Sequence, residues 1–286
     1  MQTILLKDGR QLAYAEYGDP RGIPVFLFHG VPGSRIFRPP LDDLTARAGV
    51  RLITVDRPGM GGSDFQPGRR LSDWPADVSA LADSLGQKRF AVCGHSAGGP
   101  YALVCAARIP DRLTAAAAIS GLGPVEAPGA MDGMRPRNRL GFACGRYLPW
   151  PVWRLGIWIL FHRAKNHPEE FVHPDVEDPA NPDNAMLAMP GGLQVCLDST
   201  REAFRQGMIG HALDSYLVVH PWDFSLREIR MPVHLWHGLE DCDAPIGMAR
   251  AVARALPDCR AHFLEGEGHL LIFKYWKEIL AELTTG

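Results

Sequence analysis

The sequence predicts an α/β protein in which a mostly parallel β-sheet carries helices on both of its faces. Residues 24–28 and 50–55 are short, continuously apolar runs, as expected of strands that are covered on both sides. Residues 41–48, which lie between them, are long enough for the crossover helix that parallel neighbours require. Because strand-like and helix-like segments keep alternating along the chain, we expect a parallel sheet with right-handed crossovers.

Local signals predict the other elements in order. Residues 3–7 and 11–17 flank Asp8-Gly9, which predicts an antiparallel hairpin. Residues 73–85 have the spacing of an amphipathic helix, with Ser72 or Asp73 as its N-cap and Gly86 as its stop. The remaining predicted strands are 89–93, 114–120, 232–236 and 260–264, and the remaining predicted helices are 99–108, 245–256 and 272–283.

The alternation stops between residues 123 and 230, a region rich in proline, tryptophan and arginine. Within it, residues 150–162 and 199–219 are predicted to be helical, and residues 173–183 to form a loop. A helical insertion between two sheet strands is the economical explanation. We therefore expect a main domain of residues 1–122 and 231–286 and a helical cap domain of residues 123–230.

Composition and charge exclude several functional classes. A formal net charge of −2 gives no electrostatic reason to expect nucleic acid or an anionic membrane as a partner. The six cysteines lack the spacing of a disulfide framework and the histidines lack metal-ligand spacing, so we expect free thiols and no metal site. The N-terminus is too polar for a signal peptide, and Arg154 and two prolines interrupt the apolar run 148–161, so no membrane span is expected. These features predict a cytoplasmic protein.

The most informative stretch is Gly94-His95-Ser96-Ala97-Gly98, between the predicted strand 89–93 and the predicted helix 99–108. A serine on such a strand–turn–helix bend has its hydroxyl pushed out of the backbone. The two glycines are needed because a Cβ at either position would collide with the neighbouring strand or helix. This context favours Ser96 as a nucleophile over a structural glycine–serine turn.

A serine hydroxyl needs a base and a group that orients the base. His269 follows the last predicted strand, at the sheet edge where ligands bind in open α/β sheets, and is the predicted base. The alternative is a surface histidine. Asp241, in the loop after strand 232–236, is the predicted orienting acid. Glu240 and Asp243 compete with it on the same loop, with helix capping or solvation as their other roles.

Attack on a carbonyl also creates an oxyanion that needs fixed hydrogen-bond donors. One predicted donor is the backbone N–H of Ala97, at the positive end of the helix that follows Ser96. The second is the N–H of Val31, in the glycine-rich loop after strand 24–28. In that loop His29 is expected to brace the backbone rather than transfer protons. The glycine-rich residues 56–63 lack a phosphate-binding pattern and are expected to shape the site.

Together these segments resemble the α/β-hydrolase superfamily over residues 1–122 and 231–286. The resemblance is carried, in the order of that family, by His-Gly-x-Pro at 29–32, residues 56–63, the serine turn at 94–98, Gly238-x-x-Asp241 and Gly268-His269. It implies an α/β-hydrolase fold: an eight-stranded, mostly parallel sheet flanked by helices, with a helical cap inserted after the sixth strand. It also implies a Ser96-His269-Asp241 triad that works through an acyl-enzyme without a cofactor.

Departures from the family narrow this expectation. Ser96 argues against haloalkane dehalogenases and α/β-fold epoxide hydrolases, which use a carboxylate nucleophile. Val31 argues against the His-Gly-Gly-Gly loop of hormone-sensitive-lipase-like esterases. Proline iminopeptidases have a similar loop and also need cap carboxylates for the substrate ammonium. The carboxylates available for that role, which are expected to be solvated instead, are Glu169, Glu170, Asp175 and Glu177.

Aromatic residues of the cap region suggest an apolar pocket. The residues expected to line it are His29, His95, Trp150, Trp153 and Trp158. Such a pocket favours a small-to-medium hydrophobic ester or a lactone as the substrate, and thus a carboxylesterase. A proline-iminopeptidase-like aminopeptidase and a triad-bearing ligand receptor with slow turnover are the alternatives. The sequence leaves a homodimer open.

Overall fold

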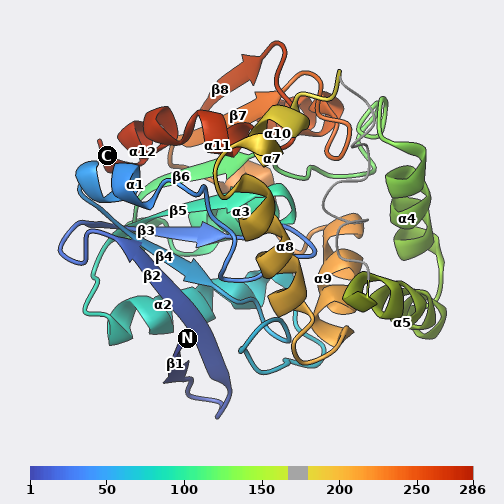
Figure 1. Ribbon diagram of the computed structural model, residues 1–286, viewed down its shortest axis with the longest axis horizontal. Helices are drawn as coiled ribbons and strands as arrows, with labels where there is room; N and C mark the ends of the chain where they lie inside the picture. The colour runs from blue at the N-terminus through green and yellow to red at the C-terminus, as the bar shows by residue number, and fades with distance from the viewer. Residues whose placement is uncertain (167–179, 286) are drawn as a thin grey trace.

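A computed structural model of the chain describes residues 1–166 and 180–285. Its centre is an eight-stranded sheet in the order β1-β2-β4-β3-β5-β6-β7-β8 (Figure 1). β2 pairs antiparallel with β1 and with β4, whereas the remaining neighbours pair in parallel. The strands are β1 Gln2–Leu5, β2 Gln11–Gly18, β3 Ile23–Phe28, β4 Val50–Val55, β5 Phe90–His95, β6 Leu113–Ile119, β7 Val233–Gly238 and β8 Cys259–Leu264. The predicted mostly parallel, eight-stranded sheet is confirmed.

Helices from the chain before residue 123 and after residue 230 flank this sheet. They are α1 Asp42–Arg47, α2 Trp74–Ser84, α3 Gly99–Arg108, α10 Ile246–Ala255, α11 Leu271–Lys274 and α12 Trp276–Thr284. Alternate side chains of one strand face opposite layers. Phe26 and Phe28 of β3 pack in the core on the side of α2, α3 and α10. Val25 and Leu27 pack in the core on the side of α1 and α12. Burial on both faces explains why the central strands are continuously apolar.

The segment of residues 123–230, which we call the insertion, leaves the sheet after β6 and returns to it at β7. Its described helices are α4 Pro136–Tyr147, α5 Trp150–Asn166, α7 Asp183–Ala188, α8 Gly192–Ala203 and α9 Ile209–Val219. In Figure 1 they gather beside the ends of the parallel strands, away from β1 and β2. The insertion therefore lies on the side of the sheet where loops such as the one after β5 emerge.

Two helix predictions need correction. Residues 199–219 are not one helix, because the chain turns between α8 and α9 at Gly207, whose φ of 102° suits glycine. Residues 272–283 are also divided: Tyr275, at φ −98° and ψ 17°, separates α11 from α12. The predicted loop 173–183 lies mostly outside the described residues.

Candidate active site

The turn after β5 holds Ser96 in a strained backbone conformation. Ser96 has a φ of 54°, a left-handed value that is uncommon for a residue other than glycine. The chain around it is packed so closely that an added Cβ on Gly94 would lie 2.0 Å from the carbonyl oxygen of Gly98. A Cβ on Gly98 would lie 2.1 Å from the carbonyl oxygen of Phe28. The two glycines of the motif therefore allow β5, β3 and the start of α3 to approach one another.

His269 and Asp241 meet at the carboxyl ends of β7 and β8. The His269 Nδ1 lies 2.8 Å from Asp241 Oδ2. Asp241 is buried, and its Oδ1 accepts hydrogen bonds from the backbone N–H groups of Asp243 at 2.9 Å and Ala244 at 2.8 Å. These bonds fix the carboxylate, which in turn fixes the His269 tautomer with the proton on Nδ1.

Electrostatics favours charge on both partners of this pair. Burial by itself would lower the pKa of His269, but the charge and hydrogen bond of Asp241 outweigh burial and raise it to about 9. Burial would conversely raise the pKa of Asp241, whereas the neighbouring His269 holds that pKa below its ordinary value. Asp241 is thus suited to stabilise an imidazolium.

The competing acids of the loop have other partners. Asp243 accepts hydrogen bonds from Arg135 Nη1 at 2.9 Å and from Asn138 Nδ2 at 2.6 Å, both at the start of α4. Glu240 Oε2 accepts from the backbone N–H of Glu267 at 3.1 Å. Of the three carboxylates, Asp241 is therefore the one that His269 contacts.

The loop after β3 lies directly against Ser96. An added Cβ on Gly30 would lie 3.0 Å from the Cβ and 3.4 Å from the Oγ of Ser96. His29 is buried, and its Nδ1 is 2.7 Å from the carbonyl oxygen of Gly30. Burial lowers the pKa of His29 well below its ordinary value. The neutral imidazole braces the loop, while Val31 follows at the cavity wall.

A cavity of about 360 Å³ separates the sheet edge from the insertion. Ser96, Ala97, Val31 and His269 line it on the sheet side, and Trp153 on the insertion side. The other apolar residues that the insertion contributes are Phe142, Ile157, Leu187, Cys196, Val218 and Val219. Its polar lining residues are Arg135, Arg137, Asn138, Asn181, Asp183, Asn184, Ser199, Thr200, His211 and Ser215. The wall supplied by the insertion is thus mixed rather than purely apolar.

The structure places two of the five residues expected to line the pocket in the cavity wall. His95 and Trp153 lie in the cavity wall, and Trp153 also donates from Nε1 to the Ala212 carbonyl oxygen at 3.0 Å. His29 is beneath the loop after β3, so it is outside the wall. Trp150 packs beside Tyr216, and Trp158 is 48% exposed on α5. Glu169, Glu170, Asp175 and Glu177 lie outside the described residues.

Sequence reasoning missed His211, a cavity residue of α9. Burial lowers the pKa of His211 to about 4, so its imidazole is neutral. Its Nδ1 is buried without a hydrogen-bond partner among the described residues. A lone histidine outside any recognisable motif gives no signal in the sequence, and its place in the cavity wall becomes visible only in the structure.

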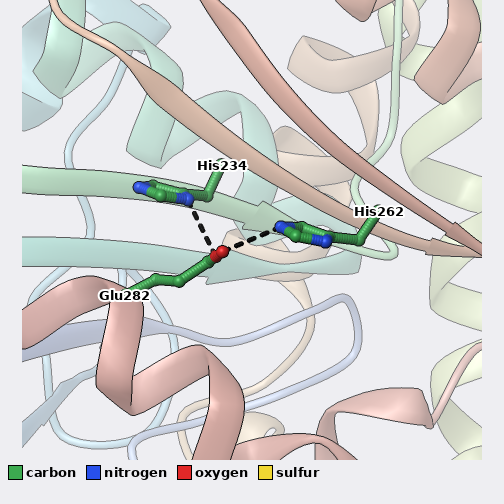
Figure 2. A group of neighbouring side chains, drawn as sticks. All are labelled: His234, His262 and Glu282. Atoms are coloured by element: carbon green, nitrogen blue, oxygen red, sulfur yellow. Dashed lines mark hydrogen bonds and ion pairs between the residues drawn. The ribbon is translucent and has the colours of Figure 1, made fainter.

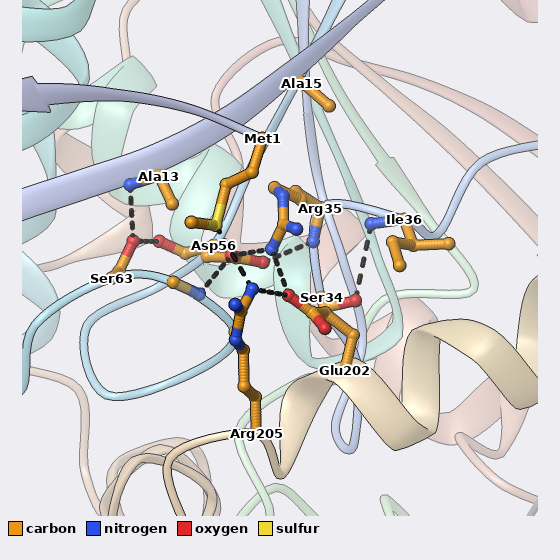
Figure 3. A network of polar contacts seen from close by, with 12 residues as sticks. Met1, Ala13, Ala15, Ser34, Arg35, Ile36, Asp56, Ser63, Glu202 and Arg205 are labelled. Atoms are coloured by element: carbon orange, nitrogen blue, oxygen red, sulfur yellow. Dashed lines mark hydrogen bonds and ion pairs between the residues drawn. The ribbon is translucent and has the colours of Figure 1, made fainter.

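Residues 56–63 brace the site from behind rather than lining it. Asp56 accepts hydrogen bonds at 2.6 Å from both the backbone N–H and Nη1 of Arg35 (Figure 3). The same guanidinium lies 2.7 Å from Glu202 of α8. Ser63 Oγ donates to the Asp56 carbonyl oxygen at 2.7 Å and accepts from the Ala13 N–H at 2.9 Å. This network ties the loop after β3 to the sheet and to the insertion.

Among residues 1–166 and 180–285, one group of side chains of the types that can bind a metal lies away from the cavity, on β7, β8 and α12. The ligand atoms of His234, His262 and Glu282 are within 4.8 Å of one another (Figure 2). Glu282 Oε2 is 2.8 Å from His234 Nδ1, and Oε1 is 2.8 Å from His262 Nε2. Oε2 also accepts from Trp236 Nε1 at 2.8 Å. Because Glu282 already has these partners, we interpret the cluster as a clasp between α12 and the sheet.

Among the described residues, no helix has the length and apolar character needed to cross a membrane.

Comparisons with known proteins agree with this architecture. A family model described as the alpha/beta hydrolase fold matches residues 23–274. The bifunctional esterase/perhydrolase DCH of Acinetobacter calcoaceticus is 30% identical over 261 residues, which cover 86% of this chain and 84% of that protein. A non-heme chloroperoxidase of Streptomyces lividans is 34% identical over 134 residues, 44% of this chain and 46% of that protein. The solved structure of the esterase RhEst1 from Rhodococcus sp. ECU1013 has a TM-score of 0.69 at 20% identity, covering 99% of this chain and 97% of that one. The chain belongs to the α/β-hydrolase fold family.

Proposed function

We propose that the protein is a serine hydrolase that cleaves a small-to-medium hydrophobic carboxylic ester, or a lactone, through an acyl-enzyme on Ser96. The observation that carries this proposal is the 2.8 Å contact of His269 Nδ1 with Asp241, at a cavity that Ser96 also lines. The similarity to an esterase/perhydrolase over 86% of this chain and 84% of that protein supports the same reaction class.

The proposed acylation step follows from the proton positions. With its Nδ1–H donated to Asp241, His269 has a free electron pair on Nε2. Nε2 takes the Ser96 proton as Oγ forms a bond to the ester carbonyl carbon. The N–H groups of Val31 and Ala97 then stabilise the oxyanion. When this intermediate collapses, the carbon–oxygen bond to the alcohol breaks, and His269 gives the alcohol its proton.

Deacylation repeats these steps with water. His269 removes a proton from water, whose oxygen attacks the acyl carbon, and the second tetrahedral intermediate releases the acid. The proton returns from His269 to Ser96 Oγ. Asp241 remains ionised throughout and stabilises the imidazolium.

The proposed substrate class rests on the cavity. Its volume of about 360 Å³ is in the range of small-molecule sites, and Phe142, Trp153 and Val218 give its insertion side apolar surface. We therefore assign the insertion the role of a cap that excludes water from the acyl group. Exclusion of water also strengthens the oxyanion hydrogen bonds.

A substrate panel tests the proposal. Aryl esters of increasing acyl length, aliphatic lactones and a proline aryl amide are assayed with the unmodified protein, Ser96→Ala and Ser225→Ala. Ser225 is an exposed serine of the insertion and provides the matched control. We expect ester or lactone hydrolysis that Ser96→Ala abolishes and Ser225→Ala leaves unchanged, with both variants folded by circular dichroism.

Each of three results would contradict the proposed function. Hydrolysis by Ser96→Ala at the normal rate would remove Ser96 as the nucleophile. Preferential cleavage of the proline amide would indicate an aminopeptidase. Stoichiometric acylation of Ser96 without turnover, seen by intact-protein mass spectrometry, would indicate a ligand receptor.

A further inference from the structure

We propose that two buried carboxylates of the insertion, Asp183 and Asp214, are positioning residues that complete the catalytic apparatus. Asp183 holds the backbone of His269, and Asp214 acts through Arg57 on the loop that carries Val31. The inference rests on the proposed serine-hydrolase function. It adds that the insertion fixes the geometry of both the base and one oxyanion donor, besides covering the cavity.

Asp183 begins α7 and lies against the chain that carries the catalytic histidine. Its Oδ2 accepts a hydrogen bond from the His269 N–H at 3.1 Å, and its Oδ1 accepts one from the Leu270 N–H at 2.7 Å. An added Cβ on Gly268 would lie 2.6 Å from the Asp183 Oδ1. Asp183 is only 8% exposed, so water does not readily replace these bonds. A carboxylate with two acceptor oxygens fits two adjacent N–H groups.

These bonds complete a set of restraints around His269. Asp183 holds its N–H, His95 Nε2 lies 3.0 Å from its carbonyl oxygen, and Asp241 holds its Nδ1. Phe37 stacks on His95 with ring centroids 4.7 Å apart and thereby supports that contact. The backbone and the ring of the base are thus fixed by separate partners, and the partner of the N–H comes from the insertion.

Asp214, in α9, is the centre of a buried charged network. Its Oδ2 accepts from Arg57 Nε at 2.7 Å, and its Oδ1 accepts from Tyr101 Oη at 2.6 Å and from Arg69. The side chains of Asp214 and Arg57 are both 0% exposed. Paired charges of this kind keep one another in a single geometry, because leaving either unpaired in the interior is costly.

Arg57 transmits that geometry to the oxyanion loop. Its guanidinium donates to the carbonyl oxygen of His29 and, at 3.0 Å, to that of Gly30. The Gly30 C=O and the Val31 N–H belong to one planar peptide unit, in which they point in opposite directions. A hydrogen bond that fixes the Gly30 carbonyl oxygen therefore fixes the direction of the Val31 N–H. Asp214 sets the position of Arg57 and hence, indirectly, the oxyanion donor.

Asp183 is tested with Asp183→Asn, and Asp198→Asn on the exposed side of α8 is the matched control. The amide keeps one acceptor but turns an NH2 group towards a backbone N–H. We expect kcat for an aryl ester to fall by roughly 10- to 100-fold with little change in KM, as for a base displaced by a fraction of an ångström. The negative charge of Asp183 helps to raise the pKa of His269, so the acid limb of the kcat/KM profile should move to lower pH.

Arg57→Lys tests the second contact, because Asp214→Asn leaves two arginines facing a neutral amide and can prevent folding. Lysine keeps the positive charge but carries its donors on one nitrogen, whereas Arg57 reaches Asp214 and the two carbonyl oxygens from three separate nitrogens. We expect kcat to fall by about 100-fold or more, the cost of losing an oxyanion donor. Arg108→Lys, the same change at an exposed arginine of α3, is the matched control and should leave kcat unchanged.

Two readouts separate this inference from the proposed function. The rate of Ser96 phosphonylation by a fluorophosphonate needs no ester substrate, and NMR titration of the His269 ring reports its pKa directly. The inference predicts slower phosphonylation in Asp183→Asn and Arg57→Lys, and a lower His269 pKa in Asp183→Asn. Normal phosphonylation in both folded variants, with an unchanged His269 titration, would overturn it even if the protein is an esterase. If the protein cleaves none of the panel, the proposed substrate class fails and these two measurements still decide the inference.

Discussion

Asp241 and Asp243 lie only two residues apart in the sequence but have different surroundings. Asp241 is buried and faces His269, whereas Asp243 binds Arg135 and Asn138 of the insertion. The local backbone produces this division, since Asp241 Oδ1 accepts from the Asp243 N–H and turns the two side chains apart. A carboxylate orients a base only where its free oxygen meets the imidazole.

The first prediction compares these two residues. Asp241→Asn should lower kcat on the order of 10⁴-fold, because the amide no longer imposes the Nδ1–H tautomer or stabilises the imidazolium. Asp243→Asn should cost less than about 10-fold, since its main partners are on α4. Steady-state kinetics on one aryl ester provides both values. A larger loss for Asp243→Asn would assign the orienting role to Asp243.

The second prediction concerns the pH dependence of the rate. His269 accepts a proton only when it is neutral, and Asp241 raises its pKa to about 9. The value of kcat/KM should therefore rise with pH from neutral towards about 9 and level off above it. Rates at constant ionic strength, measured with an ester that is stable in alkali, test this. A profile that is flat from about pH 5 to 8 would contradict a histidine base.

At the scale of elements, the site is built where β3, β5, β7 and β8 end. Parallel strands bring their carboxyl ends to one edge, so loops distant in sequence converge there. α12 is attached to the same sheet by Glu282, which contacts His234, His262 and Trp236. This clasp connects the C-terminal helix to β7 and β8 without entering the cavity.

The third prediction is that Glu282→Gln destabilises the fold while leaving the chemistry intact. The amide loses a charge-assisted acceptor that is only partly exposed, so the free energy of unfolding should fall by about 1 kcal/mol. Glu278→Gln, an exposed carboxylate of the same helix, is the control and should stay within about 0.5 kcal/mol. Urea denaturation monitored by tryptophan fluorescence measures both. Equal stabilities of the two variants would show that the clasp contributes nothing.

At the scale of the whole molecule, the sheet and the insertion line one cavity. Charged residues of the insertion contact the loops of the sheet from several sides: Glu202 meets Arg35, Asp214 meets Arg57 and Arg69, and Asp183 meets the chain of His269. Folding of the sheet and docking of the insertion are therefore coupled. The protonation state of His269 consequently affects the free energy of unfolding of the whole molecule.

The fourth prediction is the pH dependence of that stability. The folded-state pKa of His269 is about 9, against 6.5 for the unfolded side chain. The contribution of its ion pair is therefore complete below about pH 6.5 and is lost as the pH rises to about 9. The melting temperature of Ser96→Ala should decline over this range, and the decline should be smaller in Ser96→Ala/His269→Ala. Parallel curves for the two variants would rule out the raised pKa.

The sequence determined the fold family, because the fold depends on patterns that are local in the chain. Apolar strands, crossover helices and the Gly94–Gly98 turn each have a steric signature within a few residues. The same signatures singled out Ser96, His269 and Asp241, and the last two meet because β7 and β8 are neighbours. Their catalytic roles stay predictions until the variants are measured.

Only the tertiary structure decided which residues of the insertion reach the site. Trp153 and Trp158 lie on one helix, yet the docking direction of α5 buries the first in the cavity wall and leaves the second exposed. Asp183 follows a proline in a polar stretch and Asp214 is a single acidic residue of the mostly apolar helix α9. The partners of both are more than 80 residues away in the chain. Local periodicity carries no information about such distant contacts, since they depend on how two separately patterned parts of the chain pack together. The serine turn could thus be predicted from sequence, but the contacts that hold His269 and the loop of Val31 could not.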